Sequence, residues 1–185
     1  MPVSVPRFLA LRATALAGLL SLSGGMATLL QPQGAWAQAE PTKALETTGS
    51  PFSLSAVNTL LVRGDAAAAS GNLNEARRLY DQARDATRRL LGFYRDLSGS
   101  FRGLDARIPR EMDNKGRDAL ETMAKANLRL AAVFRRQNQP EVAVPLLVEV
   151  VKVMTPANED GRKAYQQLVE LGFAATPYTA PASGS

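Results

Sequence analysis

Residues 60–83 read LLVRGDAAAASGNLNEARRLYDQA, and this stretch decides the fold. Apolar residues recur at three- and four-residue steps on both sides of a polar break at Gly71, as helices with one apolar face require. This periodicity predicts a helix over about 53–70 and a second over about 75–91, with Asn74 as its N-cap. Gly71 suits the left-handed backbone of a tight turn between them. The stretch therefore predicts a helical hairpin.

Small and aromatic residues stand at fixed places in this hairpin, namely Gly64, Gly71, Ala76, Tyr80 and Ala83. With these spacings the hairpin resembles one tetratricopeptide repeat, a 34-residue helix-turn-helix unit. The resemblance implies that the small residues let the two helices approach and that the aromatic ring fills the space between them. The family's aromatic residue early in its first helix and its closing proline are both missing here.

A second unit follows over 124–157, with Ala131, Phe134 and Ala143 at the corresponding packing places and Asn138 at the turn. Asn tolerates the left-handed backbone almost as Gly does. Pro145 departs from the pattern, and it should cost a hydrogen bond and either bend the second helix of this unit or delay its start.

Residues 159–173 make a third, partial unit, and a lone final helix is what a repeat array uses as its cap. We therefore expect an all-α fold, a tetratricopeptide-like α-solenoid over 54–173 with a terminal capping helix. The segment 92–114 contains three Gly, two Ser and Pro109, which predicts a break in the pattern. It is either an irregular insert or a degenerate repeat, with a helix starting again near Arg110 or Lys115.

The N-terminal region has the order of a secretory signal peptide over 1–37: a basic start, an uncharged apolar run over 13–30, and small residues at Ala37 and Ala39 for cleavage. The alternative is that the apolar run stays as a membrane anchor. Residues 38–53 are rich in Pro, Gly, Ser and Thr and are expected to form a flexible linker. Residues 174–185 have a similar composition and are expected to be disordered.

Composition excludes several kinds of chemistry. The chain has no Cys and no His, so thiolate nucleophiles, zinc–thiolate sites and an imidazole base are absent. We expect no enzymatic activity, no metal site and no cofactor. The net charge of +5 is mild and does not demand nucleic acid as a partner. In signal, length and repeats the chain resembles small exported repeat proteins of cyanobacteria, which implies the periplasm or the thylakoid lumen.

The resemblance also implies a binding face, because the first helix of each repeat lines the concave side of such a solenoid. Lys125 and Arg129 stand where chaperone-binding members of the family hold a terminal carboxylate. The first unit offers Leu61 and Asp65 instead of the required Lys and Asn, so we expect an anion-attracting groove and not a true clamp. The residues implied at this face are Asn58, Leu61, Asp65, Lys125, Leu128, Arg129, Ala132, Arg135 and Arg136.

The segment 92–114 offers a second candidate surface, because it interleaves arginines with aromatics: Phe93, Tyr94, Arg95, Phe101 and Arg102. Arg and aromatic residues are enriched in the energetically dominant parts of protein interfaces. An anionic membrane surface is an alternative partner, and a purely structural role for the aromatics is another. The sequence thus predicts an exported scaffold or assembly factor that binds a protein or an anionic peptide.

Overall fold

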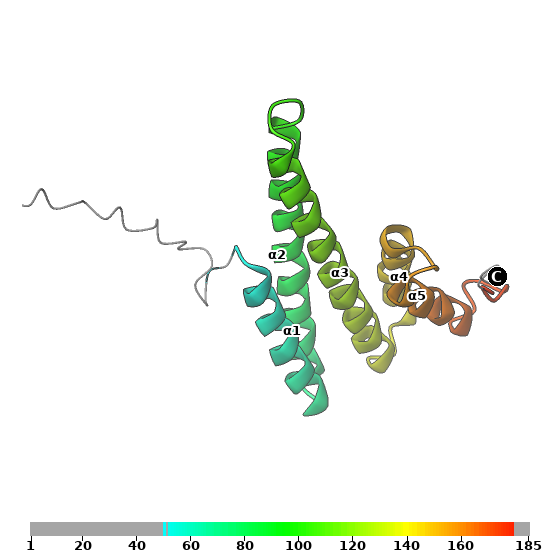
Figure 1. Cartoon of the computed structure of the whole chain (residues 1–185). Helices are drawn as coiled ribbons and strands as arrows, with labels where there is room; N and C mark the ends of the chain where they lie inside the picture. The colour runs from blue at the N-terminus through cyan, green and yellow to red at the C-terminus, as the bar shows by residue number, and fades with distance from the viewer. Residues whose placement is uncertain (1–49, 51, 180–185) are drawn as a thin grey trace, which may run out of the picture. The chain divides into compact units, whose positions relative to one another are not determined.

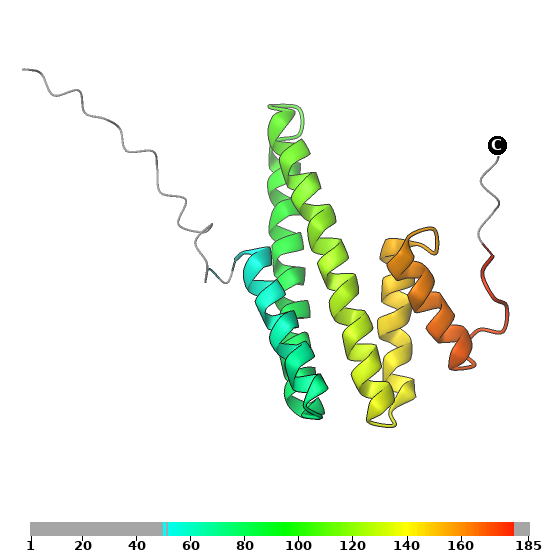
Figure 2. The ribbon, with the colours of Figure 1, turned by 60° about the horizontal axis from the view of Figure 1, so that its bottom comes forward.

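The computed structural model describes residue 50 and residues 52–179, and this part of the chain is all-α, as predicted. It contains no strand. Its helices, shown in Figures 1 and 2, are α1 (Leu54–Ala69), α2 (Leu73–Ser100), α3 (Arg107–Arg136), α4 (Pro140–Met154) and α5 (Glu159–Glu170).

Helices that follow one another in the chain pack side by side: α1 on α2, α2 on α3, α3 on α4 and α4 on α5 (Figure 2). Two further contacts join α1 to α3 and α3 to α5. Helix α3 therefore touches every other helix. Helices α1 and α5 each contact α3 but not each other, and α2 and α4 meet only through side chains.

Helices α1, α3 and α5 end in the same way. In each, the residue after the last turn has a positive φ: 82° at Gly71, 59° at Asn138 and 75° at Gly172. The next amide donates to a carbonyl five residues back, at 2.9, 2.9 and 3.0 Å. This is the Schellman motif, which satisfies carbonyls left free at a helix C-terminus. The turn positions recognised in the sequence thus share one backbone geometry.

The start of α2 differs from the prediction. Asn72, and not Asn74, caps the helix, because its Oδ1 accepts the amide of Glu75 at 3.2 Å. An Asn followed three residues later by Glu is a strong N-terminal signal, and it sets the first residue at Leu73. The Asn74 side chain instead accepts a hydrogen bond from Gln137 Nε2 at 3.1 Å, which links the bottom of α2 to the end of α3.

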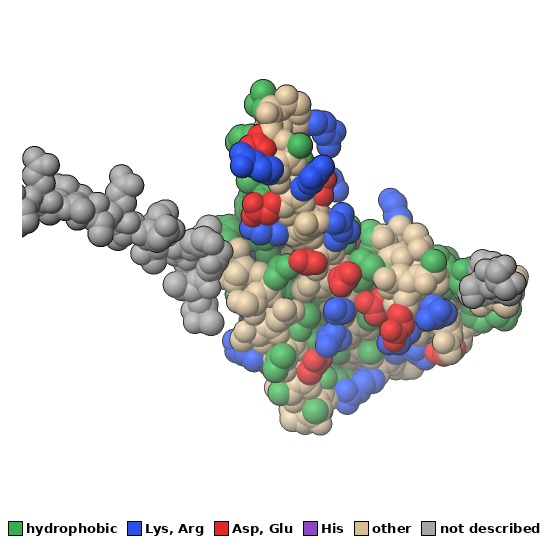
Figure 3. Space-filling view, viewed as in Figure 1, with side chains coloured by type: hydrophobic (Ala, Val, Ile, Leu, Met, Phe, Trp, Pro, Cys, Tyr) green, Lys and Arg blue, Asp and Glu red, His purple; other side chains and the backbone are tan. Residues whose placement is uncertain are grey.

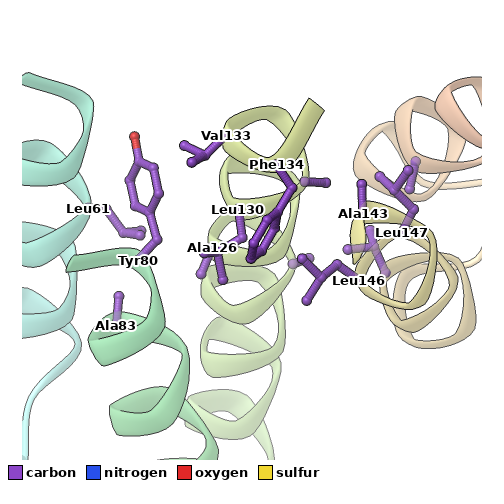
Figure 4. Packing of buried hydrophobic residues seen from close by; sticks show 14 of the residues in the cluster. Leu61, Tyr80, Ala83, Ala126, Leu130, Val133, Phe134, Ala143, Leu146 and Leu147 are labelled. Carbon is purple, nitrogen blue, oxygen red and sulfur yellow. The ribbon is translucent and has the colours of Figure 1, made fainter. Parts of the chain in front are cut away.

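The core lies where these helices meet. Figure 4 shows Tyr80 beside Leu61 next to α1, and apolar side chains of α3 and α4 facing one another further along. All residues expected to pack the repeats are buried except Gly71, which lies exposed in its turn: Gly64, Ala76, Tyr80, Ala83, Ala131, Phe134 and Ala143.

The segment 92–114, where the sequence predicted a break, is helical except for residues 101–106. Helix α2 continues to Ser100, and α3 already begins at Arg107. Ser98 and Met112 are buried between the two helices, so packing outweighs the roughly 1 kcal/mol that each internal Gly costs. Pro109 falls in the first turn of α3, where no intrahelical partner for its missing N–H is needed.

Two further expectations are corrected near the C-terminus. Pro145 does not delay α4, which begins at Pro140 and continues through Pro145. Residues 174–179 do not hang free, because the amide of Ala174 donates to Leu168 O at 3.2 Å and Tyr165 OH donates to Thr176 O at 2.8 Å. The tail therefore lies along α5.

The predicted signal peptide, most of the linker and residues 180–185 lie outside the described residues. Within the described part, no helix combines the length and the apolar character needed to cross a bilayer.

One stability prediction follows from the closest approach of α1 and α2. A Cβ at Gly64 would lie 2.3 Å from Tyr80 Cε1, so the Gly64→Ala variant must displace the ring. We expect it to lower the free energy of unfolding by about 1–3 kcal/mol, measured by urea titration.

The matched control is Gly92→Ala, also inside a helix but with no atom within 4 Å of the added Cβ. It should raise stability by roughly 0.5–1 kcal/mol, since Ala favours the helix. Equal effects of the two substitutions would show that the Gly64 contact is not a steric constraint.

Candidate partner-binding surfaces

The face expected to be concave carries a polar network that is satisfied within the chain. Asp65 Oδ1 on α1 accepts a hydrogen bond from Tyr80 OH on α2 at 2.6 Å. The same carboxylate pairs with Arg129 on α3, through Nε at 2.8 Å and NH2 at 3.1 Å. The resemblance implied that Asp65 and Arg129 face a ligand. In the structure they face each other.

This network shifts the pKa of its members, including Asp65 and Tyr80. Burial raises the pKa of Asp65, but hydrogen bonds from Arg129 and Tyr80 outweigh it and leave the pKa below its ordinary value of 3.8. Burial, together with the hydrogen bond to Asp65, raises the pKa of Tyr80. The carboxylate thus stays ionised and the phenol stays protonated, which keeps the bridge between the three helices intact at neutral pH.

The other arginines of this face are also engaged. Arg135 NH1 on α3 pairs with Glu170 on α5 at 3.2 Å and donates to Gln167 Oε1 at 3.2 Å. Arg136 NH1 donates to the carbonyl of Ala68 at the end of α1, at 3.0 Å. These contacts join α1, α3 and α5, so the cations expected to attract an anion hold the helices together.

The remaining residues of the expected binding face fall into three groups. Leu61 is only 4% exposed and belongs to the core, so it is not available to a partner. Leu128 is half-buried and packs against the core, and Asn58 and Ala132 are exposed. Lys125 is exposed and has no ion pair within residues 52–179. The structure therefore does not gather the predicted residues into an open cationic groove.

A second polar cluster, not anticipated from the sequence, lies between α2 and α4. Glu149 on α4 accepts hydrogen bonds from Arg84 at 2.9 Å and from Arg88 at 2.8 Å. Asn127 on α3, which is fully buried, donates to Glu149 Oε2 at 3.1 Å. A signal existed in the sequence, because Glu149 is an isolated carboxylate in the apolar part of the run PEVAVPLLVEVVKVM.

The far end of the α2–α3 hairpin, which we call the distal hairpin (residues 93–120), carries three exposed large apolar side chains. Phe93 is 51% exposed, Leu97 43% and Leu104 80%. In Figure 1 this end extends past α1 and α4, and Figure 3 shows hydrophobic, basic and acidic side chains mixed over it. The Phe93 ring meets that of Phe52, with centroids 5.9 Å apart.

The predicted Arg and aromatic residues of the distal hairpin are divided between packing and exposure. Tyr94 and Phe101 are half-buried between the helices. Arg95 and Arg102 are exposed, and neither forms an ion pair with any residue that the structure describes. The sequence did not predict that the two helices of this hairpin run almost to its tip, to Ser100 on α2 and from Arg107 on α3.

A cavity of about 220 Å³ opens on one side of the distal hairpin. Its apolar lining includes Leu91, Met112 and Leu120, and its rim carries Arg95, Arg102 and Arg117. Asp113 also lines it and accepts a hydrogen bond from Ser98 Oγ at 2.9 Å. Three arginines and one aspartate therefore line this site. Among the described residues no cluster of acidic side chains is arranged to hold a metal ion.

The ion pairs predict the response of the fold to acid. Burial raises the pKa of Glu149, but hydrogen bonds from Arg88 and Arg84 outweigh it, so its pKa lies below 4.5, as that of Asp65 lies below 3.8. The unfolded chain then takes up protons first on acidification. We expect the free energy of unfolding to stay constant while the pH is above these ordinary pKa values. It should fall as the pH drops through them.

In urea titrations between pH 3 and 6, the Asp65→Asn variant should be less stable at the upper end of this range and should lose less stability on acidification than the wild type. Asp96→Asn, an exposed side chain without an ion pair in the described structure, is the control and should keep the wild-type profile. An unchanged profile for Asp65→Asn would mean that its ion pair does not form in solution.

Comparisons with known proteins find no matching family model, curated protein or solved structure. The function proposed for this chain therefore depends on its own residues and contacts.

Proposed function

We propose that this chain is an exported protein-binding module, a scaffold or assembly factor, that contacts its partner mainly through the distal hairpin. The observation that carries the proposal is the exposure of Phe93, Leu97 and Leu104 beside arginines that have no ion pair in the described structure. Large apolar side chains mixed with Arg are the residues that dominate binding energy at protein interfaces.

The placement of the other arginines supports this choice. On α3, Arg129, Arg135 and Arg136 have partners within the chain, on α1 and α5. A ligand at that face would have to break those contacts, and the desolvation and lost pairing would oppose binding. At the distal hairpin, binding costs no internal ion pair of Arg95 or Arg102.

The tetratricopeptide assignment is part of this proposal. The repeated Schellman motif after α1, α3 and α5, and the close contact of Gly64 with Tyr80, support it. A scaffold role agrees with such folds, which present extended surfaces to proteins. Export to a periplasm or thylakoid lumen, as the N-terminal pattern predicts, completes the proposal and requires no cofactor.

The test is retention of a partner from native extract by the chain from Gln38 to Ser185. The variant Phe93→Ser/Leu97→Ser/Leu104→Ser removes apolar groups of the distal hairpin. We expect it to retain at least about tenfold less partner than the wild type, because truncating an apolar side chain that dominates an interface costs over about 1 kcal/mol of binding free energy. Retention is measured by quantitative mass spectrometry.

The matched control is Val62→Ser/Val148→Ser/Phe173→Ser, which removes three exposed apolar side chains elsewhere on the molecule. It should retain the partner as the wild type does. Equal loss in both variants would point to general stickiness, and equal retention in both would place the binding surface away from the distal hairpin.

A peripheral membrane role is the second candidate, favoured by Leu104, which is 80% exposed between Arg102 and Arg107. Basic residues near an exposed apolar group attract a protein to anionic lipids. If the protein-binding proposal holds, the purified chain should stay in the supernatant with phosphatidylglycerol vesicles at low salt. Sedimentation that added salt reverses would support the membrane role instead.

A further inference from the structure

Helix α4 shows how a helix binds the side of the α2–α3 hairpin. It packs on α3 and places Glu149 between Arg84 and Arg88 of α2, at 2.9 and 2.8 Å. The buried Asn127 of α3 supplies a further hydrogen bond to the same carboxylate at 3.1 Å. The chain thus contains one helix held on the hairpin by apolar packing and by a carboxylate gripped between two arginines.

The same side of the hairpin continues beyond α4. On α2, Arg95 follows Arg88 by seven residues, which returns it to nearly the same face of the helix, and Arg102 lies in the turn just after α2 ends at Ser100. On α3, Leu120 precedes Asn127 by the same step. Arg95, Arg102 and Leu120 line the 220 Å³ cavity, and no residue of α4 does. We call this continuation the distal groove.

Helix α4 ends too early to cover the distal groove. Met154 is the last residue of α4 and lies five residues beyond Glu149, a rise of about 7.5 Å along the helix. Arg95 lies seven residues beyond Arg88, or about 10 Å along α2, and Arg102 follows in the turn after α2. After Met154 the chain turns at Thr155, which has a positive φ of 56°, and enters α5.

The chemistry of the distal groove matches the kind of helix that α4 represents. Its lining offers the apolar side chains of Leu91, Met112 and Leu120. Its rim carries three arginines, of which Arg95 and Arg102 have no partner in the described structure and Arg117 donates only to the amide oxygen of Asn114. A carboxylate between such arginines would gain what Glu149 gains between Arg84 and Arg88.

We propose that the distal groove binds an amphipathic helix of the partner protein that carries Glu or Asp on its contact face, packed where a longer α4 would lie. This inference rests on the proposed function and names the partner's chemistry: apolar residues for the lining and carboxylates for Arg95 and Arg102. The helix thereby extends the α4 layer along the hairpin.

The probe is a synthetic peptide as long as α4, 15 residues, held helical by a side-chain staple. It has leucines on one face and two glutamates seven residues apart on the same side. Binding to the purified chain from Gln38 to Ser185 is measured by fluorescence anisotropy at low salt. A second peptide with Gln in place of both Glu reports the contribution of the carboxylates.

The groove variant is Arg95→Glu/Arg102→Glu, and the matched control is Arg89→Glu/Arg110→Glu. The control makes the same change in net charge. Its two exposed arginines lie on α2 and α3 and do not line the groove. Circular dichroism must show unchanged helicity for both. We expect the groove variant to weaken binding of the Glu peptide about tenfold or more and the control to change it about twofold or less.

A charge exchange makes the test independent of folding defects. A peptide with Lys in place of the two Glu should bind the Arg95→Glu/Arg102→Glu variant and not the wild type. Three results would overturn the proposal: no binding of the Glu peptide to the wild type, equal binding of the Glu and Gln peptides, or equal weakening by the two double variants.

These outcomes are separable from those of the proposed function. Should the peptide fail while the wild type still retains a partner through Phe93, Leu97 and Leu104, the distal hairpin remains the binding site and only the acidic helix is ruled out. Should the peptide bind while the Phe93→Ser/Leu97→Ser/Leu104→Ser variant retains the extract partner fully, the groove stands and the choice of those apolar anchors is wrong.

Discussion

The contact of the Tyr80 ring with the bare backbone of Gly64 determines how the first three helices are arranged. Because Gly64 has no side chain, the ring lies against α1, and a Cβ would stand only 2.3 Å from it. That position brings Tyr80 OH within 2.6 Å of Asp65, which in turn holds Arg129 of α3. A steric constraint between α1 and α2 thus places the carboxylate that links both helices to α3.

The second unit solves the same packing problem with other residues. Ala131 and Leu147, both fully buried, stand where the first unit has Gly64 and Tyr80. Relative to the first unit, the residue on the first helix is larger and the residue on the second helix is smaller, and such compensating changes of volume are tolerated in a core. Leu147 has no hydroxyl, so the second unit cannot repeat the Tyr80–Asp65 bond. Its polar link comes from Glu149, on the side of α2 rather than α1.

Local signals in the sequence predicted much of the fold, and longer-range contacts account for what it did not predict. The turns at Gly71 and Asn138 and the buried positions around them follow from helix periodicity and backbone preference. The length of α2 and α3 does not, because Gly92, Gly99 and Pro109 look like breaks when each helix is considered alone. Only their mutual packing, through residues such as Ser98 and Met112, keeps both helices continuous. The Arg84–Glu149 pair spans 65 residues and no local pattern reveals it.

Contacts between distant parts of the chain also explain why the distal hairpin, and not the face expected to be concave, is the favoured binding surface. A count of charges along the sequence treats every arginine as available for binding. An arginine within 3 Å of a carboxylate of its own chain, however, contributes little to the binding of a partner. Arg129 and Arg84 are of that kind, whereas Arg95 and Arg102 form no ion pair with any described residue. The extra length of α2 and α3 is therefore what leaves cations and apolar side chains uncovered. A hairpin longer than the helices beside it ends in a surface that another helix can complete.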